Sequence, residues 1–152
     1  MDPQLIHHWY EQYRTGIYRF ALSLLRDSQQ AEDVLQETFV KLLTGKFRVP
    51  VPGKEKAWIF RVARNLCMDI LRKRSRETEL PPVTAASRGE NLEFVELISP
   101  LPQREQEILC LKFIGGFTHG EIAKITGTTV HATKKRYERA IQKLREEMEV
   151  SP

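Results

Sequence analysis

The sequence predicts an all-α protein, and three observations support that fold class. Apolar residues recur every three or four positions through most of the chain, which is the period of a helix with one buried face. No segment of useful length alternates apolar and polar residues, so no strand is predicted. A segment that contains Pro81 and Pro82 interrupts the helical pattern, which favours two small helical domains joined by a flexible linker.

Two amphipathic helices are predicted at the start of the chain. The first covers about residues 5–25. The second can be capped by Asp27 or Ser28 and should stop at Gly45. The polar face of the second helix is acidic, and it is either solvated or a binding surface for a basic protein. Its candidate binding residues are Asp33, Gln36 and Glu37.

A third helix is predicted over about residues 55–74, after a loop that contains Pro50 and Pro52. Its apolar stripe, which includes Leu66 and Ile70, falls on the side opposite its basic residues and Met68. Residues 54–76 carry a net charge of +6. Basic side chains beside aromatic ones suit unstacked nucleic-acid bases, although a basic face can also be merely solvated. The candidate contacts are Phe47, Arg48, Trp58, Arg61, Arg64, Asn65 and Arg72.

The second half of the chain begins with an acidic segment, since residues 77–108 carry a net charge of −5. Residues 77–100 have the composition of a linker, with a short helical turn predicted at 92–98. Helices are then expected over about residues 103–113, 118–125 and 129–148, and the apolar stripe of the last one includes Met148. The predicted domains are therefore residues 1–76 and 101–152.

The last two predicted helices form a helix-turn-helix motif. Thr118 and Glu121 have the spacing of a capping box, and Gly127 can supply the turn. Val130 is expected to anchor the second helix, whose first turns would enter the major groove of DNA. The alternative is an ordinary helical hairpin with a solvated charged face. The candidate DNA contacts are His131, Lys134, Lys135, Arg136 and Arg139.

Composition excludes several other classes of function. The 152 residues are 41% hydrophobic and 29% charged, which is typical of a globular protein. No apolar run is long enough to span a membrane and no secretory signal is evident, so we expect a cytoplasmic protein without membrane contact. Cys67 and Cys110 are too widely spaced for a zinc motif, and both are expected in the core.

No catalytic residue, metal site or cofactor is expected. The histidines are not arranged as ligands, the acidic residues lack metal-site spacing, and no glycine-rich phosphate loop is present. These features favour a binding protein over an enzyme.

Three segments, taken in order, resemble the extracytoplasmic-function (ECF, group IV) sigma factors of bacterial RNA polymerase. They are residues 31–39 (AEDVLQETF), residues 57–65 (AWIFRVARN) with Asp69 and Arg72, and residues 101–127, which begin LPQRE. The resemblance covers most of the chain. It implies sigma region 2 at residues 1–76, a linker at 77–100 and region 4 at 101–152. It also implies promoter-specific initiation of transcription.

The resemblance implies a role for each candidate surface. Asp33, Gln36 and Glu37 would dock on the clamp helices of the polymerase's largest subunit. Region 4 would dock on the flap of core polymerase. The loop at 47–54 would capture a flipped base of the minus-ten element, with Asn65 beside the pocket. The helix from Val130 would read the minus-thirty-five element. An anti-sigma factor is a further implied partner. The residues implied to melt and hold the non-template strand are Trp58, Arg61, Arg64 and Arg72.

Two other functions account for less of the sequence. A stand-alone helix-turn-helix regulator would explain the C-terminal motif but not the two N-terminal ones. A helical protein-interaction adaptor would expose apolar faces without basic patches. The recognition helix also departs from the family's usual run, with His131 and Thr133 in place of a small and an apolar residue, so the promoter sequence is not predicted.

Overall fold

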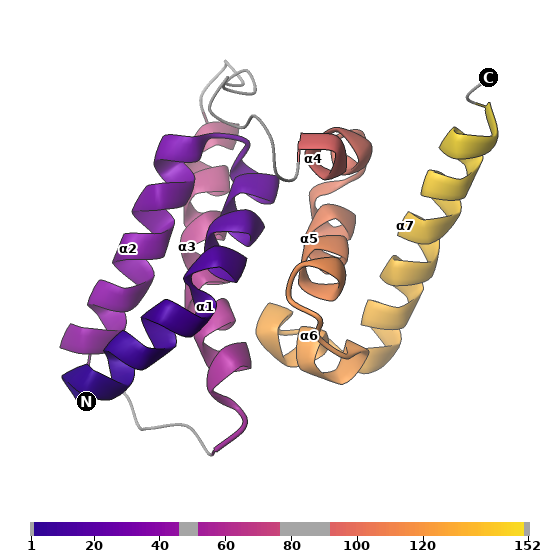
Figure 1. The fold of residues 1–152 in the computed structure, drawn as a ribbon. Helices are drawn as coiled ribbons and strands as arrows, with labels where there is room; N and C mark the ends of the chain where they lie inside the picture. Colours follow the sequence, from indigo (N-terminus) through magenta and orange to yellow (C-terminus); the bar gives the residue numbers. More distant parts are fainter. Residues whose placement is uncertain (1, 46–51, 77–91, 151–152) are drawn as a thin grey trace.

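The computed structural model describes residues 2–45, 52–76 and 92–150, and within them it contains seven helices and no strand (Figure 1). The all-α prediction is confirmed. None of the described helices is long and apolar enough to cross a membrane. The helices are α1 (Pro3–Leu25), α2 (Ser28–Thr44), α3 (Glu55–Ser75), α4 (Leu92–Ile98), α5 (Gln103–Phe113), α6 (His119–Thr126) and α7 (Val130–Val150).

Helices α1, α2 and α3 lie side by side as one bundle (Figure 1). Asp2 caps α1 by accepting a hydrogen bond from the Gln4 amide, and Asp27 caps α2 by accepting one from the Gln30 amide at 3.1 Å. Gly45 ends α2 as predicted, but with φ −77°, so a left-handed conformation is not the reason. The largest buried side chains include Phe20, Leu25, Leu42 and Ile59.

Helices α4 to α7 form the second group. α6 begins with the predicted capping box: the Glu121 amide donates to the Thr118 hydroxyl at 3.2 Å, and the Thr118 amide donates to the Glu121 carboxylate at 2.9 Å. Gly127 adopts the left-handed conformation, with φ 74°, that turns the chain into α7. This geometry confirms the predicted helix-turn-helix. Residues 77–91 of the predicted linker lie outside the described residues, and α4 follows them.

The inner face of α7 differs from the prediction in two places. Val130, the expected anchor, is 43% exposed, and Met148 is 67% exposed. Thr133 is fully buried instead, and its hydroxyl donates to the Thr129 carbonyl at 2.9 Å. A threonine can fill this apolar position because its hydroxyl is satisfied within its own helix.

The hydrophobic core is continuous between the two groups of helices. Phe60 of α3 packs edge-on against Phe117, in the turn before α6, with ring centroids 5.1 Å apart. Cys67 of α3 and Cys110 of α5 are both fully buried, as predicted. In this structure α4–α7 are therefore docked on α1–α3 along α3 and α1.

Candidate nucleic-acid and protein interfaces

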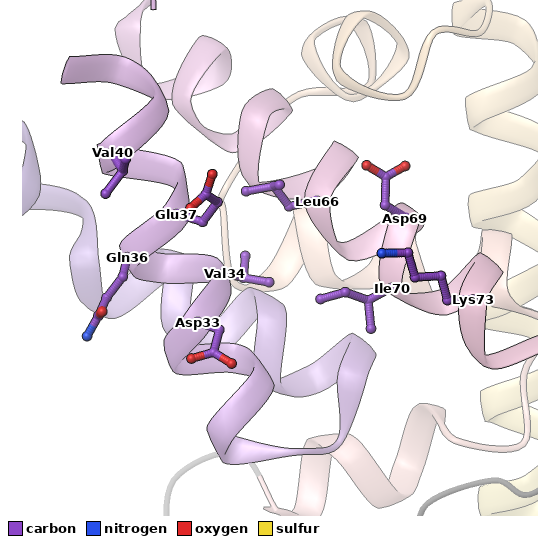
Figure 2. Close-up of a pocket in the computed structure, with 9 residues that line it drawn as sticks. All are labelled: Asp33, Val34, Gln36, Glu37, Val40, Leu66, Asp69, Ile70 and Lys73. Carbon is purple, nitrogen blue, oxygen red and sulfur yellow. The ribbon is translucent and has the colours of Figure 1, made fainter. Parts of the chain in front are cut away.

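A groove of about 500 Å³ runs between α2 and α3. Figure 2 shows Val34 and Glu37 of α2 facing Leu66 and Ile70 of α3 across it. Its floor is apolar and its rim is mainly acidic, with Lys73 the basic residue of the lining. The candidate residues predicted on the acidic face are exposed and line this groove together. They are Asp33, Gln36 and Glu37.

The apolar floor was missed by the sequence analysis, which placed Leu66 and Ile70 in the buried stripe of α3. Both are only half-buried. Val40 of α2 also lines the groove and is 47% exposed. An apolar floor with an acidic rim suits a helix that presents apolar and basic side chains.

The basic face of α3 is partly open. Arg61, Asn65 and Arg72 are exposed, and Arg72 forms an ion pair with Asp69. Trp58 is half-buried, and its ring lies edge-on to that of Trp9 at 6.2 Å. The predicted contacts Phe47 and Arg48 lie outside the described residues.

Arg64 is not on the open part of this face. Its Nε donates to Glu107 Oε1, and its Nη2 lies 3.5 Å from Glu107 Oε2. Met68, expected on the same open side, is buried beside Gln103 of α5. The expectation of an uncovered basic face was wrong here, because the period of a single helix cannot reveal that a distant segment packs against it.

The recognition helix α7 presents four of its five predicted contacts to solvent: His131, Lys134, Lys135 and Arg139. Arg136 is half-buried and lines a cavity of about 190 Å³ with Arg64, Arg104 and Glu107. Its side chain therefore lies at the boundary between the two groups of helices.

A cluster around His119 was missed by the sequence analysis. The His119 ring lies edge-on to that of Tyr137 at 5.0 Å, and its Nδ1 is buried with no hydrogen-bond partner among the described residues. Burial lowers the pKa of His119, and the nearby Lys112 and Lys134 lower it further, while Glu138 opposes them. The same Tyr137 ring lies 6.4 Å from that of Phe113, which is 58% exposed.

No group of three or more histidine, cysteine or acidic side chains within the described residues could hold a metal ion. The described residues form three candidate binding surfaces: the groove between α2 and α3, the basic face of α3, and the helix-turn-helix of α6 and α7.

Comparison with known proteins gives the family of a chain that carries these three surfaces. Residues 9–77 match the family model of Sigma-70 region 2, and residues 91–144 match that of Sigma-70 region 4. The chain is 30% identical to the ECF RNA polymerase sigma factor SigM of Bacillus subtilis, over 90% of this chain and 90% of that protein. It is 33% identical to EcfG of Rhodopseudomonas palustris, over 82% and 75%. The chain belongs to the ECF RNA polymerase sigma factors.

Solved structures agree with this family. The sigma factor RpoE of Bartonella quintana, solved with the anti-sigma factor NepR, has a TM-score of 0.77 at 26% identity, over 96% of this chain and 98% of that one. CnrH, solved with the cytosolic domain of CnrY, shares the fold with a TM-score of 0.78 at 23% identity, over 99% and 92%.

The predicted function is confirmed at the level of the family. The protein is a sigma factor that directs promoter-specific initiation of transcription by RNA polymerase. Members of the family are regulators of transcription rather than enzymes.

Proposed function

We propose that the groove between α2 and α3 docks on the clamp helices of core RNA polymerase. The observation that carries this proposal is the exposed acidic rim, with Asp33 and Glu37, above the apolar floor formed by Val34, Leu66 and Ile70. Acidic side chains steer and orient a basic partner, while the apolar floor supplies affinity. Gln36 lies on the same rim and can hydrogen-bond the partner.

The open part of α3 holds the melted minus-ten strand in this proposal. Arg61 and Arg72 are exposed and can contact phosphates, and Asn65 is exposed and can contact a base edge. Trp58 offers an aromatic edge beside them. Phe47 and Arg48 remain predicted contacts on the grounds of the family resemblance alone.

The exposed face of α7 reads the minus-thirty-five element. His131, Lys134 and Lys135 lie in its first two turns, the part of a recognition helix that reaches base edges. Arg139, one turn further on, is suited to a phosphate contact. Arg136 can contact DNA together with these residues only when the cavity between the two groups of helices opens.

The division of the chain follows from these roles. Residues 1–76 act as region 2, 77–100 as the linker and 101–152 as region 4, which also contacts the flap. The polymerase performs the chemistry and the sigma factor none, so no cofactor is required, and the protein acts in the cytoplasm. An anti-sigma factor is a further partner, by analogy with NepR bound to RpoE of Bartonella quintana.

Run-off transcription tests the function as a whole. Core polymerase with this protein should transcribe a subset of a genomic fragment library, and the transcribed fragments should share two sequence elements at fixed spacing. Core polymerase alone is the control. The absence of any transcript that depends on this protein would overturn the proposal.

A pull-down tests the docking groove. Asp33→Ala combined with Gln36→Ala should reduce retention of core polymerase about tenfold, the effect of losing roughly 1.4 kcal/mol of contacts. The matched control is Glu32→Ala, because Glu32 is also an exposed acid of α2 but lines a different surface, beside Tyr18 and Arg19. Equal retention of all three proteins, at equal helicity, would show that the groove is not the docking site.

A further inference from the structure

A largely buried ion pair joins α3 to α5. Arg64 donates hydrogen bonds from Nε and Nη2 to the two carboxylate oxygens of Glu107. Its Nη1 lies 3.5 Å from the Asn65 amide oxygen. The Arg64 side chain is 22% exposed and that of Glu107 is 5% exposed. A buried carboxylate needs a charged partner, and removing one member of such a pair leaves the other charge buried and uncompensated.

Other contacts continue along the same side of α3. Lys56 Nζ donates to the Gly115 carbonyl at 2.5 Å, and Phe60 packs on Phe117. Lys56, Phe60 and Arg64 are spaced four residues apart, so they form one stripe that faces α5 and the turn that follows it. Over several turns of α3, charged and aromatic side chains thus have defined partners in the second group of helices.

This arrangement conflicts with DNA binding by the same face. Arg64 lies beside Asn65 and shares its helix face with Arg61 and Met68. While Arg64 is paired with Glu107, its charge is compensated and only 22% of its side chain is exposed.

We propose that the Arg64–Glu107 pair is an intramolecular latch. In the free protein, α5 and the turn after it occupy part of the minus-ten face of α3 as a competitor of the melted strand. Release of the pair uncovers Arg64 for DNA and opens the cavity that Arg136 lines. The proposal rests on the proposed DNA-binding role of the α3 face.

Two buried thiols offer a direct readout of the latch. Cys67 lies on α3 and Cys110 on α5, both are fully buried, and each feels the charge of Glu107. Separation of α4–α7 from α1–α3 would expose them, so their rate of alkylation by N-ethylmaleimide measures how often the two groups of helices come apart.

The chain also contains a matched control. Glu105 lies two residues before Glu107 on α5, and its buried carboxylate pairs with Lys143 of α7 at 2.8 Å. Glu105→Gln therefore removes a buried acidic charge from the same helix without touching α3.

The experiment compares full-length wild type, Glu107→Gln and Glu105→Gln. The probe for binding is a fluorescein-labelled single strand that carries the minus-ten segment of a promoter from the run-off screen. Glu107→Gln should be alkylated about tenfold faster and should bind the strand about tenfold more tightly than wild type, whereas Glu105→Gln should match wild type in both. Equal alkylation of wild type and Glu107→Gln would overturn the latch, as would faster alkylation without tighter binding.

A charge reversal covers the case in which Glu107→Gln fails to fold. Arg64→Glu and Glu107→Arg should each expose the thiols, and the double variant should restore their protection. Failure of the double variant to restore protection would overturn the pairing. Arg61→Ala tests the underlying DNA face separately: if it leaves strand binding unchanged in the Glu107→Gln background, the proposed function of α3 fails, whatever the thiols report.

Discussion

His119 occupies the first position of α6, with its ring edge-on to Tyr137. Burial, Lys112 and Lys134 all lower its pKa from the ordinary value of 6.5, against the opposing effect of Glu138. The folded-state pKa therefore lies below the unfolded one. The neutral ring stabilises the fold above pH 6.5, and this contribution is lost as the pH falls through the folded-state pKa.

We expect the melting temperature to fall as the pH is lowered from about 7.5 to about 5, and to fall less steeply in His119→Gln. Thermal melts followed by circular dichroism at each pH measure both slopes. His131→Gln, which removes an exposed histidine from the start of α7, controls for the loss of a histidine as such. A slope for His119→Gln as steep as that of wild type would contradict the argument.

Sequence periodicity predicted which single residues are exposed better than it predicted their partners. Asp33, Glu37 and Lys134 are exposed as expected, because the polar side of an amphipathic helix follows from spacing alone. Arg64 is paired with a residue 43 positions away in the chain. No pattern within either helix contains that information, because it depends on how α5 packs on α3.

At the scale of elements, every predicted helix is present, and α4 matches its predicted range of 92–98. The start of a helix was predictable where the sequence has a capping residue, as at Asp27 and Thr118. The exposure of Val130 was not predictable, because the buried position of α7 is taken by Thr133, whose hydroxyl is satisfied only once the helix has formed.

The exposed face of α7 gives a prediction about promoter recognition. Lys134→Ala and Lys135→Ala should each weaken binding of holoenzyme to the minus-thirty-five element about fivefold to tenfold, without changing the preference at minus-ten. Competition between promoter variants, measured by run-off transcription, separates the two elements.

Arg145→Ala is the control for that experiment, since it removes an exposed cation from the far end of the same helix. Equal losses at both promoter elements would instead favour a general electrostatic role for the two lysines.

At the scale of the whole molecule, the continuous core couples the two groups of helices. Phe117 is buried and packs on Phe60 across the contact, whereas Phe113, four residues earlier in the chain, is 58% exposed. The stability of the folded protein should therefore depend strongly on Phe117 and weakly on Phe113.

Phe117→Ala should lower the free energy of unfolding by about 3 kcal/mol, because it leaves a cavity between the two groups. Phe113→Ala should change it by less than about 0.5 kcal/mol. Urea denaturation followed by circular dichroism measures both. Similar small losses for the two variants would mean that the contact between the groups adds little to stability.

The docking groove and the latch lie on different sides of α3. The groove uses Leu66 and Ile70, which face α2, while the latch uses Lys56, Phe60 and Arg64, which face α5 and the turn after it. Core polymerase can therefore reach the groove while the latch is closed. Capture by polymerase and release of the DNA face are then separate steps in time.

This order has a kinetic consequence. The association rate constant with core polymerase should be the same for wild type and Glu107→Gln, because the first encounter does not involve α5. A later, concentration-independent phase should be faster in the variant. Stopped-flow mixing with labelled core polymerase resolves the two phases, and a faster first phase in Glu107→Gln would contradict this order. In this proposed order, core polymerase selects its sigma factor through the groove before that sigma factor can select a promoter.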